Sequence, residues 1–103
     1  LYSIAEFNRE VLPRIRLVAN PGCYPTASLL PLIPLIKARL IETDGITIDA
    51  LSGISGAGRS AKQEMLFTEL DGGVSAYGVG RHRHMAEMEQ ELSMEAGREV
   101  TVS

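Results

Sequence analysis

The longest apolar stretch of the chain covers residues 25–40, which are rich in leucine and alanine. Lys37 and Arg39 lie at its far end, where basic side chains stabilise a helix C-terminus. The stretch therefore predicts a helix. Pro31 and Pro34 each remove a backbone N–H donor from it, so we expect a kink or two short helices.

A second periodic stretch, residues 85–96, predicts an amphipathic helix. Met85, Met88 and Leu92 recur on one face, and glutamates occupy the neighbouring face. This is ordinary spacing for a helix packed on a core, so the methionines are expected to be core residues rather than a binding surface. Gly97 follows at the position where glycine commonly ends a helix.

The other predicted elements are short. The capping-box form of Ser3-Ile4-Ala5-Glu6 predicts a helix that ends near Pro13. Apolar or alternating runs predict strands at residues 17–20, 46–52 and 99–103, a short helix over 61–70, and strand or irregular loop over 74–81. Together these elements indicate an α/β chain.

Length and composition fit one domain. With 103 residues, 45% of them hydrophobic, the chain can bury one modest core. Its formal net charge of −3 gives no general attraction to nucleic acid or anionic lipid. A lone cysteine cannot form an internal disulfide, and neither a signal-peptide pattern nor a membrane-length apolar run occurs, so a reducing, cytoplasmic location is expected. Because the chain starts at Leu1 and stops as a strand begins, we expect it to be a piece of a longer polypeptide.

The single cysteine lies in a turn, Asn20-Pro21-Gly22-Cys23-Tyr24-Pro25-Thr26, between an apolar run and the first long helix. Gly22 permits a tight turn, and Pro25 suits the first turn of a helix. A thiolate at Cys23 would face the unpaired N–H groups of the helix N-terminus, which stabilise it and favour nucleophilic attack. The alternative is an inert, buried cysteine acting as a small hydrophobic side chain.

Three interpretations compete for the glycine-rich loop Gly53-Ile54-Ser55-Gly56-Ala57-Gly58-Arg59-Ser60. It nearly matches a P-loop, but Arg59 stands where a lysine must reach the phosphates. Residues 56–61 also fit a dinucleotide-binding fingerprint, although no acidic residue ends the next predicted strand. The third interpretation is a tight turn that needs positive φ angles. The candidates for contacting a cofactor are Ser55, Gly56 and Gly58, and Arg59 is a candidate for holding an anion.

Both histidines and two arginines form one basic patch, Gly80-Arg81-His82-Arg83-His84, in an acidic chain. An anionic substrate suits this patch, and a histidine near neutrality can exchange the proton that thiolate chemistry requires. Zinc is the alternative, but only three ligands of the right type are present and the arginines would repel the cation, so no metal is expected. Glu87 and Gln90 follow within the next turns, where either could orient a catalytic histidine.

Three motifs together strongly resemble the N-acetyl-γ-glutamyl-phosphate reductase family: the Cys23 turn, residues 52–59, and His82-Arg83-His84 followed by Glu87-Met88-Glu89-Gln90. Order and spacing agree over most of the chain, from about Ile4 onward. The family belongs to the semialdehyde-dehydrogenase group, with an N-terminal Rossmann NADP domain and a C-terminal catalytic and dimerisation domain. The resemblance implies that residues 1–103 are one partial catalytic and dimerisation domain, an α/β (α+β) structure of the glyceraldehyde-3-phosphate-dehydrogenase-like type with a mixed sheet. The Rossmann domain is then not in this chain.

The resemblance also implies a reaction. Cys23 would attack the acyl phosphate of N-acetyl-glutamyl 5-phosphate, expel phosphate and form a thioacyl enzyme, which NADPH would reduce to N-acetyl-glutamate 5-semialdehyde in arginine biosynthesis. His82 resembles the acid/base histidine of the family. The candidates, on charge, for holding the substrate's anionic groups are Arg59, Arg81, Arg83 and His84. The full-length enzyme is expected to be a homo-oligomer, a dimer or tetramer, that takes a small-molecule substrate and binds neither nucleic acid nor membrane, whereas this chain alone is expected to be inactive.

Two other functions stay open on the residues alone. One is a non-catalytic oligomerisation or regulatory module in which Cys23 is inert, and the other is a P-loop type nucleotide binder. The reactivity of Cys23 at neutral pH separates the first of these from the enzyme.

Overall fold

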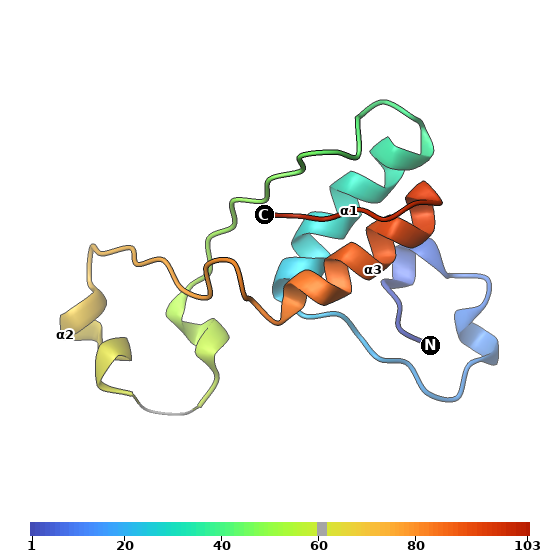
Figure 1. Ribbon diagram of the computed structural model, residues 1–103. Coiled ribbons are helices and arrows are strands. Elements are labelled where there is room, and N and C mark those ends of the chain that lie inside the picture. The colour runs from blue at the N-terminus through green and yellow to red at the C-terminus, as the bar shows by residue number, and fades with distance from the viewer. Residues whose placement is uncertain (60–61) are drawn as a thin grey trace.

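The computed structural model describes residues 1–59 and 62–103 (Figure 1). Ser60, the serine of the near P-loop, and Ala61, where the predicted 61–70 helix begins, lie outside the described residues. The elements in chain order are the 3-10 helices η1 (Ala5–Phe7) and η2 (Leu12–Arg14), α1 (Cys23–Lys37), the 3-10 helices η3 (Ile54–Ala57) and η4 (Gln63–Met65), α2 (Phe67–Leu70) and α3 (His84–Ala96).

The two long helices, α1 and α3, pack against each other and run in the same direction (Figure 1). At their N-terminal ends the ring of His84 lies against Gly22, the N-cap residue of α1. At their C-terminal ends Lys37 Nζ lies 3.3 Å from Glu95 Oε2. Both helices therefore begin at the same end of the pair.

The core lies between these helices and the chain segments beside them. The periodic apolar positions of the sequence supply it, as predicted, and Met88 is buried rather than part of a surface. The buried apolar residues are Ile4, Leu29, Ile33, Ile36, Met88, Leu92, Val100 and Val102. Gly97 ends α3 as predicted, with φ of 67° and its N–H bonded to the carbonyl of Ser93.

Pro31 and Pro34 do not divide the first helix. Both lie inside α1, which is continuous over 15 residues, so the predicted alternative of two short helices is wrong. The two prolines are exposed, and the carbonyls that they leave without donors belong to the exposed Ala27 and the half-buried Leu30. Burial of Leu29 and Ile33 offsets the two missing hydrogen bonds.

Ser3 does not cap a helix. Its hydroxyl donates to the carbonyl of Ile4, and its backbone N–H donates to the carbonyl of Ala19 at 3.1 Å. A capping box needs that N–H free for the glutamate at the third helical position, so the predicted helix to Pro13 is replaced by the separate turns η1 and η2. The prediction failed because a partner 16 residues away took the donor.

Strand pairing is limited to two parallel bridges in the described residues, Tyr2 with Ala19 and Ile46 with Val102. The second is flanked by hydrogen bonds from Ser103 N to the Ile46 carbonyl, 3.2 Å, and from Ile48 N to the Ser103 carbonyl, 2.8 Å. Leu17 is 80% exposed, so residues 17–20 are not the buried strand that was predicted. The structure is rich in helix, and the expected mixed sheet does not form within the described residues, where each strand-like segment has a single neighbour.

Residues 49–59 and 62–81, called here the projecting segment, extend away from the helix pair (Figure 1). The short helix α2 lies inside the range predicted to be helical, residues 61–70. Residues 74–81 are irregular, which is one of the two alternatives predicted for them. Several large apolar side chains of this segment are exposed, namely Leu51, Ile54, Leu66, Phe67, Val74 and Val79. The segment gives the chain its elongated extents of 45 × 35 × 19 Å.

Candidate active site

Cys23 is the first residue of α1, and its side chain is exposed. The first N–H of the helix to be bonded in the chain is that of Thr26, which donates to the Gly22 carbonyl at 3.1 Å. The N–H groups before it point out of the helix end, and the first turn carries no acidic side chain. The predicted position at a helix N-terminus is confirmed, and the alternative of a buried, purely hydrophobic cysteine is wrong.

Gly22 is needed for space rather than for an unusual turn. Its φ of −70° is open to any residue. A Cβ placed on it would fall 2.6 Å from both Cε1 and Nε2 of His84, which is closer than real Cβ contacts. The glycine therefore lets the His84 ring approach the residue next to Cys23.

His82 and His84 form an edge-to-face pair at this end of the helices. Their ring centroids are 4.8 Å apart with the rings tilted by 67°, and the His84 backbone N–H donates to His82 Nδ1 at 3.2 Å. Because Nδ1 accepts this bond, the neutral His82 ring carries its proton on Nε2. The structure therefore brings both predicted histidines to the N-terminus of α1.

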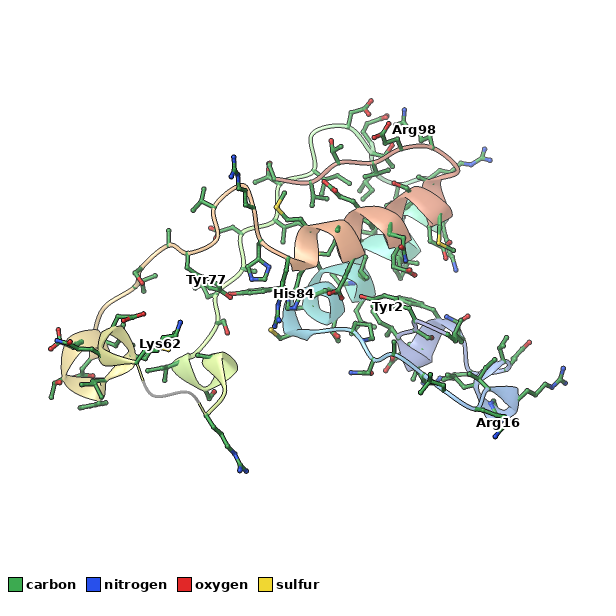
Figure 2. The ribbon with its side chains drawn as sticks, turned by 60° about the horizontal axis from the view of Figure 1, so that its bottom comes forward. Tyr2, Arg16, Lys62, Tyr77, His84 and Arg98 are labelled. Carbon is green, nitrogen blue, oxygen red and sulfur yellow. The ribbon has the colours of Figure 1, made fainter. Side chains whose placement is uncertain are left out.

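Two tyrosines surround the histidine pair. The Tyr24 ring meets His82 edge to face at 5.1 Å and His84 at 6.0 Å, while Tyr77 meets His82 at 5.4 Å. The Tyr77 hydroxyl donates to Tyr24 Oη at 2.9 Å, and mainly for this reason the pKa of Tyr77 rises to about 12. Figure 2 labels Tyr77, which the projecting segment brings against the ring of His82. Sequence reasoning missed both tyrosines, because no local signal pairs residues so far apart in the chain.

His84 is buried at the start of α3, and burial lowers its pKa below the ordinary histidine value. The neighbouring charges of His82 and Arg83 lower it as well, whereas the Glu87 carboxylate acts in the opposite direction. Among the buried side-chain atoms of the described residues, His84 Nδ1 is the one without a hydrogen-bond partner. The ring is therefore a neutral group that can still donate or accept one hydrogen bond.

Of the two residues predicted to orient a histidine, only Glu87 lies where it can act on one. Its carboxylate oxygen Oε2 accepts a 2.7 Å hydrogen bond from Tyr2, a residue that sequence reasoning did not select. Gln90 is exposed and donates to Glu91 instead, so its predicted role is wrong. Burial, reinforced by the hydrogen bond to Glu87, raises the pKa of Tyr2.

The three arginines predicted to bind anions are all exposed. Arg81 and Arg83 flank His82, and Arg83 is the N-cap residue of α3. Arg59 lies in the projecting segment. No ion pair formed by any of the three side chains occurs within residues 1–59 and 62–103, so their charges are available to an anion.

The glycine-rich loop folds as a turn and not as a phosphate cradle. Its residues Ile54–Ala57 form η3, and α2 begins only at Phe67, whereas a P-loop or a dinucleotide fingerprint runs directly into a long helix. A Cβ on Gly56 would meet Ser52 Oγ at 2.8 Å, and Gly58 has φ of 78° with open space around it. Ser55, Gly56 and Gly58 are exposed, which leaves their backbone groups accessible to a ligand.

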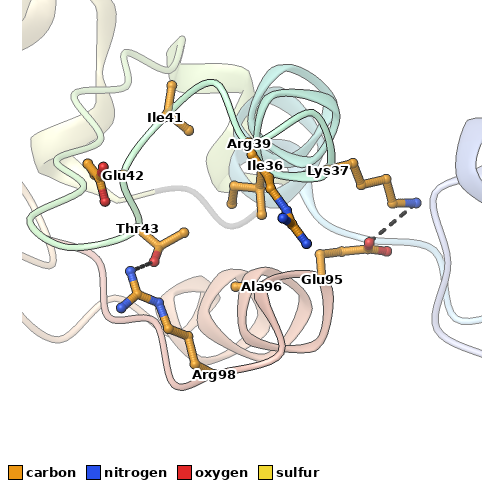
Figure 3. Close-up of a pocket in the computed structure, with 9 residues that line it drawn as sticks. All are labelled: Ile36, Lys37, Arg39, Ile41, Glu42, Thr43, Glu95, Ala96 and Arg98. Carbon is orange, nitrogen blue, oxygen red and sulfur yellow. Dashed lines mark hydrogen bonds and ion pairs between the residues drawn. The ribbon is translucent and has the colours of Figure 1, made fainter.

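A hollow of about 380 Å³ lies at the C-terminal ends of α1 and α3 (Figure 3). Arg98 lines it and hydrogen-bonds Thr43, while Lys37 and Glu95 form the ion pair that joins the helix ends. This hollow is remote from Cys23 and the histidines. Across the described residues no three His, Cys, Asp or Glu side chains converge as metal ligands do, and none of the helices there has the length and apolarity to cross a bilayer.

Comparison with known proteins gives close relatives over the whole chain. N-acetyl-gamma-glutamyl-phosphate reductase of Afipia carboxidovorans is 58% identical over 103 residues, all of this chain and 29% of the relative. The same enzyme of Rhodospirillum rubrum is 55% identical, again over all of this chain and 29% of the relative. A protein of Arabidopsis thaliana named probable N-acetyl-gamma-glutamyl-phosphate reductase, chloroplastic, is 56% identical over all of this chain and 26% of the relative. The chain thus spans less than a third of the length of these relatives.

These identities confirm the resemblance inferred from the cysteine, glycine and histidine motifs. A family-level comparison agrees, because residues 23–103 match the family described as semialdehyde dehydrogenase, dimerisation domain. That match begins at Cys23 and includes both α1 and α3. The chain belongs to the semialdehyde dehydrogenase dimerisation domain family.

Proposed function

We propose that this chain is the catalytic part of an NADP-dependent N-acetyl-γ-glutamyl-phosphate reductase of arginine biosynthesis. The names and identities of the relatives support the substrate and the reaction class. The observation that carries the proposal is structural. The exposed Cys23 begins α1 at the end of the helix pair where His82 and His84 gather.

In the proposed reaction the Cys23 thiolate attacks the carbonyl carbon of N-acetyl-glutamyl 5-phosphate. A carbon–sulfur bond forms, the bond to the phosphate oxygen breaks, and phosphate leaves. The positive end of α1 stabilises the thiolate before attack. When bound, NADPH supplies the hydride that reduces the thioacyl group.

His82 is proposed as the acid and base of this sequence. As an imidazolium, the His82 ring gives a proton to the carbonyl oxygen during reduction and becomes neutral, and it takes that proton back when the carbon–sulfur bond breaks and the semialdehyde leaves. Arg59, Arg81 and Arg83 are proposed to hold the phosphate and carboxylate groups of the substrate. His84, which is neutral, would contact the substrate as a hydrogen-bond partner rather than as a cation.

Ser55, Gly56 and Gly58 are proposed to contact the cofactor. The open, positive-φ backbone of Gly58 fits such a contact, whereas the space above Gly56 is filled by Ser52. The loop therefore fits a contact with one edge of bound NADPH and does not enclose the cofactor. We place the main cofactor site in a Rossmann domain elsewhere in the full-length protein, which we propose to be a cytoplasmic homo-oligomer that binds neither nucleic acid nor membrane.

The test is to trap the thioacyl enzyme. Full-length protein is incubated with N-acetyl-glutamyl 5-phosphate in the absence of NADPH, and peptides are analysed by mass spectrometry. An N-acetyl-glutamyl adduct on the Cys23 peptide that is lost on adding NADPH, with release of semialdehyde, is expected. A full-length enzyme that turns over without any adduct on Cys23 would contradict the proposed chemistry, and Cys23→Ala serves as the control. The 103-residue chain alone is expected to show no turnover.

A non-catalytic oligomerisation module is the second candidate, favoured by the exposed apolar side chains of the projecting segment. The two candidates differ in the reactivity of Cys23. In the enzyme, its thiol reacts with iodoacetamide at neutral pH faster than an ordinary exposed thiol. In a purely structural module it reacts no faster.

A further inference from the structure

Tyr2 connects the two segments that carry the proposed catalytic residues. Its hydroxyl donates to Glu87 Oε2 at 2.7 Å, and Glu87 lies one turn after His84 in α3. Its backbone forms a parallel bridge with Ala19, just before the turn that leads to Cys23. Figure 2 shows the side chains of Tyr2 and His84 along the same side of α3.

Hydrogen bonds stabilise both contacts of Tyr2. The bridge to Ala19 is flanked by hydrogen bonds of 3.1 Å from Ser3 N to the Ala19 carbonyl and 2.7 Å from Ala19 N to the Leu1 carbonyl. The phenol and the carboxylate are both half-buried, and a hydrogen bond to an ionised group is stronger than a neutral one. In the described part of the chain no other side chain donates to the Glu87 carboxylate. Tyr2 therefore fixes both the backbone segment that leads to Cys23 and the orientation of the Glu87 carboxylate.

We propose that Tyr2 is a positioning residue of the active site: its hydroxyl holds the Glu87 carboxylate beside the histidine pair, and its backbone holds the segment that leads to Cys23. The proposal rests on the proposed function of Cys23 and the histidines. Tyr2 acts through Glu87 and Ala19.

The hydrogen bond between Tyr2 and Glu87 affects the pKa of His84. The groups that face His84 are Tyr24 of α1, His82 and Arg83 from the segment before α3, and Glu87 of α3 itself. Of these groups, only Glu87 raises the pKa of His84. Burial, His82 and Arg83 lower it. Without the Tyr2 hydroxyl, the carboxylate turns to water for its hydrogen bonds, and the pKa of His84 falls further.

The experiment follows the titration of His84 by NMR in the full-length protein with ¹³C-labelled histidine, assigned with His84→Gln. We expect Tyr2→Phe to lower the His84 midpoint by roughly half a unit, less than the one to three units of a fully formed charge interaction, because Glu87 is displaced rather than removed. Glu87→Gln should lower it as well, and Tyr2→Phe should add nothing in the Glu87→Gln background.

Ser93→Ala is the matched control. The Ser93 hydroxyl also fastens α3 to another segment, by accepting from Val100 N at 2.9 Å, but at the far end of the helix. Its loss should lower the melting temperature and leave the His84 midpoint unchanged. A purely structural role for Tyr2 would give this same result.

The outcomes also separate this proposal from the proposed function. An unchanged or raised His84 midpoint in Tyr2→Phe overturns the positioning role even if Cys23 forms its adduct. A lowered midpoint that persists at the same size in the Glu87→Gln background overturns it too, since the effect would then bypass Glu87. If the wild-type protein shows no reductase activity, the proposed function fails, while the titration still decides the role of Tyr2.

Discussion

His84 occupies the space that any side chain at residue 22 would need, with its Nε2 and Cε1 atoms 2.6 Å from the Cβ position of Gly22. Gly22→Ala must therefore move the His84 ring or the N-terminus of α1. We expect a loss of about 1–3 kcal/mol in the free energy of unfolding, the usual range for overpacking, measured by urea denaturation. Gly53→Ala is the matched control, because Gly53 has the same φ of −70° and its nearest neighbour is 3.9 Å away. Equal stability of the two variants would show that the ring yields without cost.

Cys23→Ser should abolish most reductase activity of the full-length enzyme while leaving the fold intact. Serine keeps the shape of the side chain but is a poor nucleophile without a strong base, so kcat/KM should fall by several orders of magnitude. The exposed position of Cys23 means that circular dichroism and the melting temperature should hardly change. Substantial turnover by a folded Cys23→Ser protein would refute the covalent role.

The two histidines and their neighbouring arginine should give different kinetic signatures. His82→Asn should lower kcat about 10²–10⁴-fold, the range for a general acid–base group. Arg83→Gln should chiefly raise KM, because it removes a charge that binds the substrate in both ground and transition states. If His82→Asn leaves kcat and its pH profile unchanged while His84→Asn abolishes turnover, the acid/base role belongs to His84.

The buried, neutral state of His84 predicts a loss of stability in mild acid. Its pKa in the folded chain lies below the unfolded value of 6.5, so between those two values the unfolded state binds more protons. The free energy of unfolding should therefore be highest above the unfolded pKa and fall as the pH drops below it. Urea denaturation at about pH 7.5 and about pH 5.5 measures this difference, and His84→Gln should reduce it. A wild-type chain that gains stability on acidification would contradict the assignment.

The glycine-rich loop should respond to NADPH and not to nucleoside triphosphates. Titration of the full-length protein should show NADPH binding and no magnesium-dependent ATP binding, since the described residues after the loop, from Lys62 onward, begin with the short helices η4 and α2 rather than a long helix. Gly58→Ala should weaken NADPH binding because its φ of 78° disfavours a side chain, whereas Gly53→Ala should not. Tight Mg-ATP binding that is lost in Arg59→Ala would restore the P-loop interpretation.

Features with a local physical cause were predictable from the sequence. The period of Met88 and Leu92 predicted α3 and its buried face, and Gly97 predicted its end. Cys23 was expected at a helix N-terminus from the Pro-Gly turn before it, and it lies there. Each of these depends on residues within a few positions of one another.

Features set by distant partners were not predictable. The predicted capping box does not form because the backbone N–H of Ser3 donates to the carbonyl of Ala19. The prolines do not divide α1 because burial of its apolar face outweighs the two missing backbone hydrogen bonds. Tyr2 and Tyr77 joined the site through partners 85 and 53 positions away, namely Glu87 and Tyr24. Periodicity and motif spacing carry no information on such pairs.

The shared direction of α1 and α3 has a consequence for the order of folding and for tolerance to change in chain length. Two helices that start at the same end cannot be joined by a tight hairpin loop, so residues 38–83 must return along the whole pair before α3 can dock. The core then forms only by closing a long loop, which favours slow folding. Closure entropy grows only with the logarithm of loop length, so insertions or deletions near Gly72, in an exposed turn of the projecting segment, should change the free energy of unfolding little. That segment can vary in length while the helix ends that hold Cys23 and His84 stay in place.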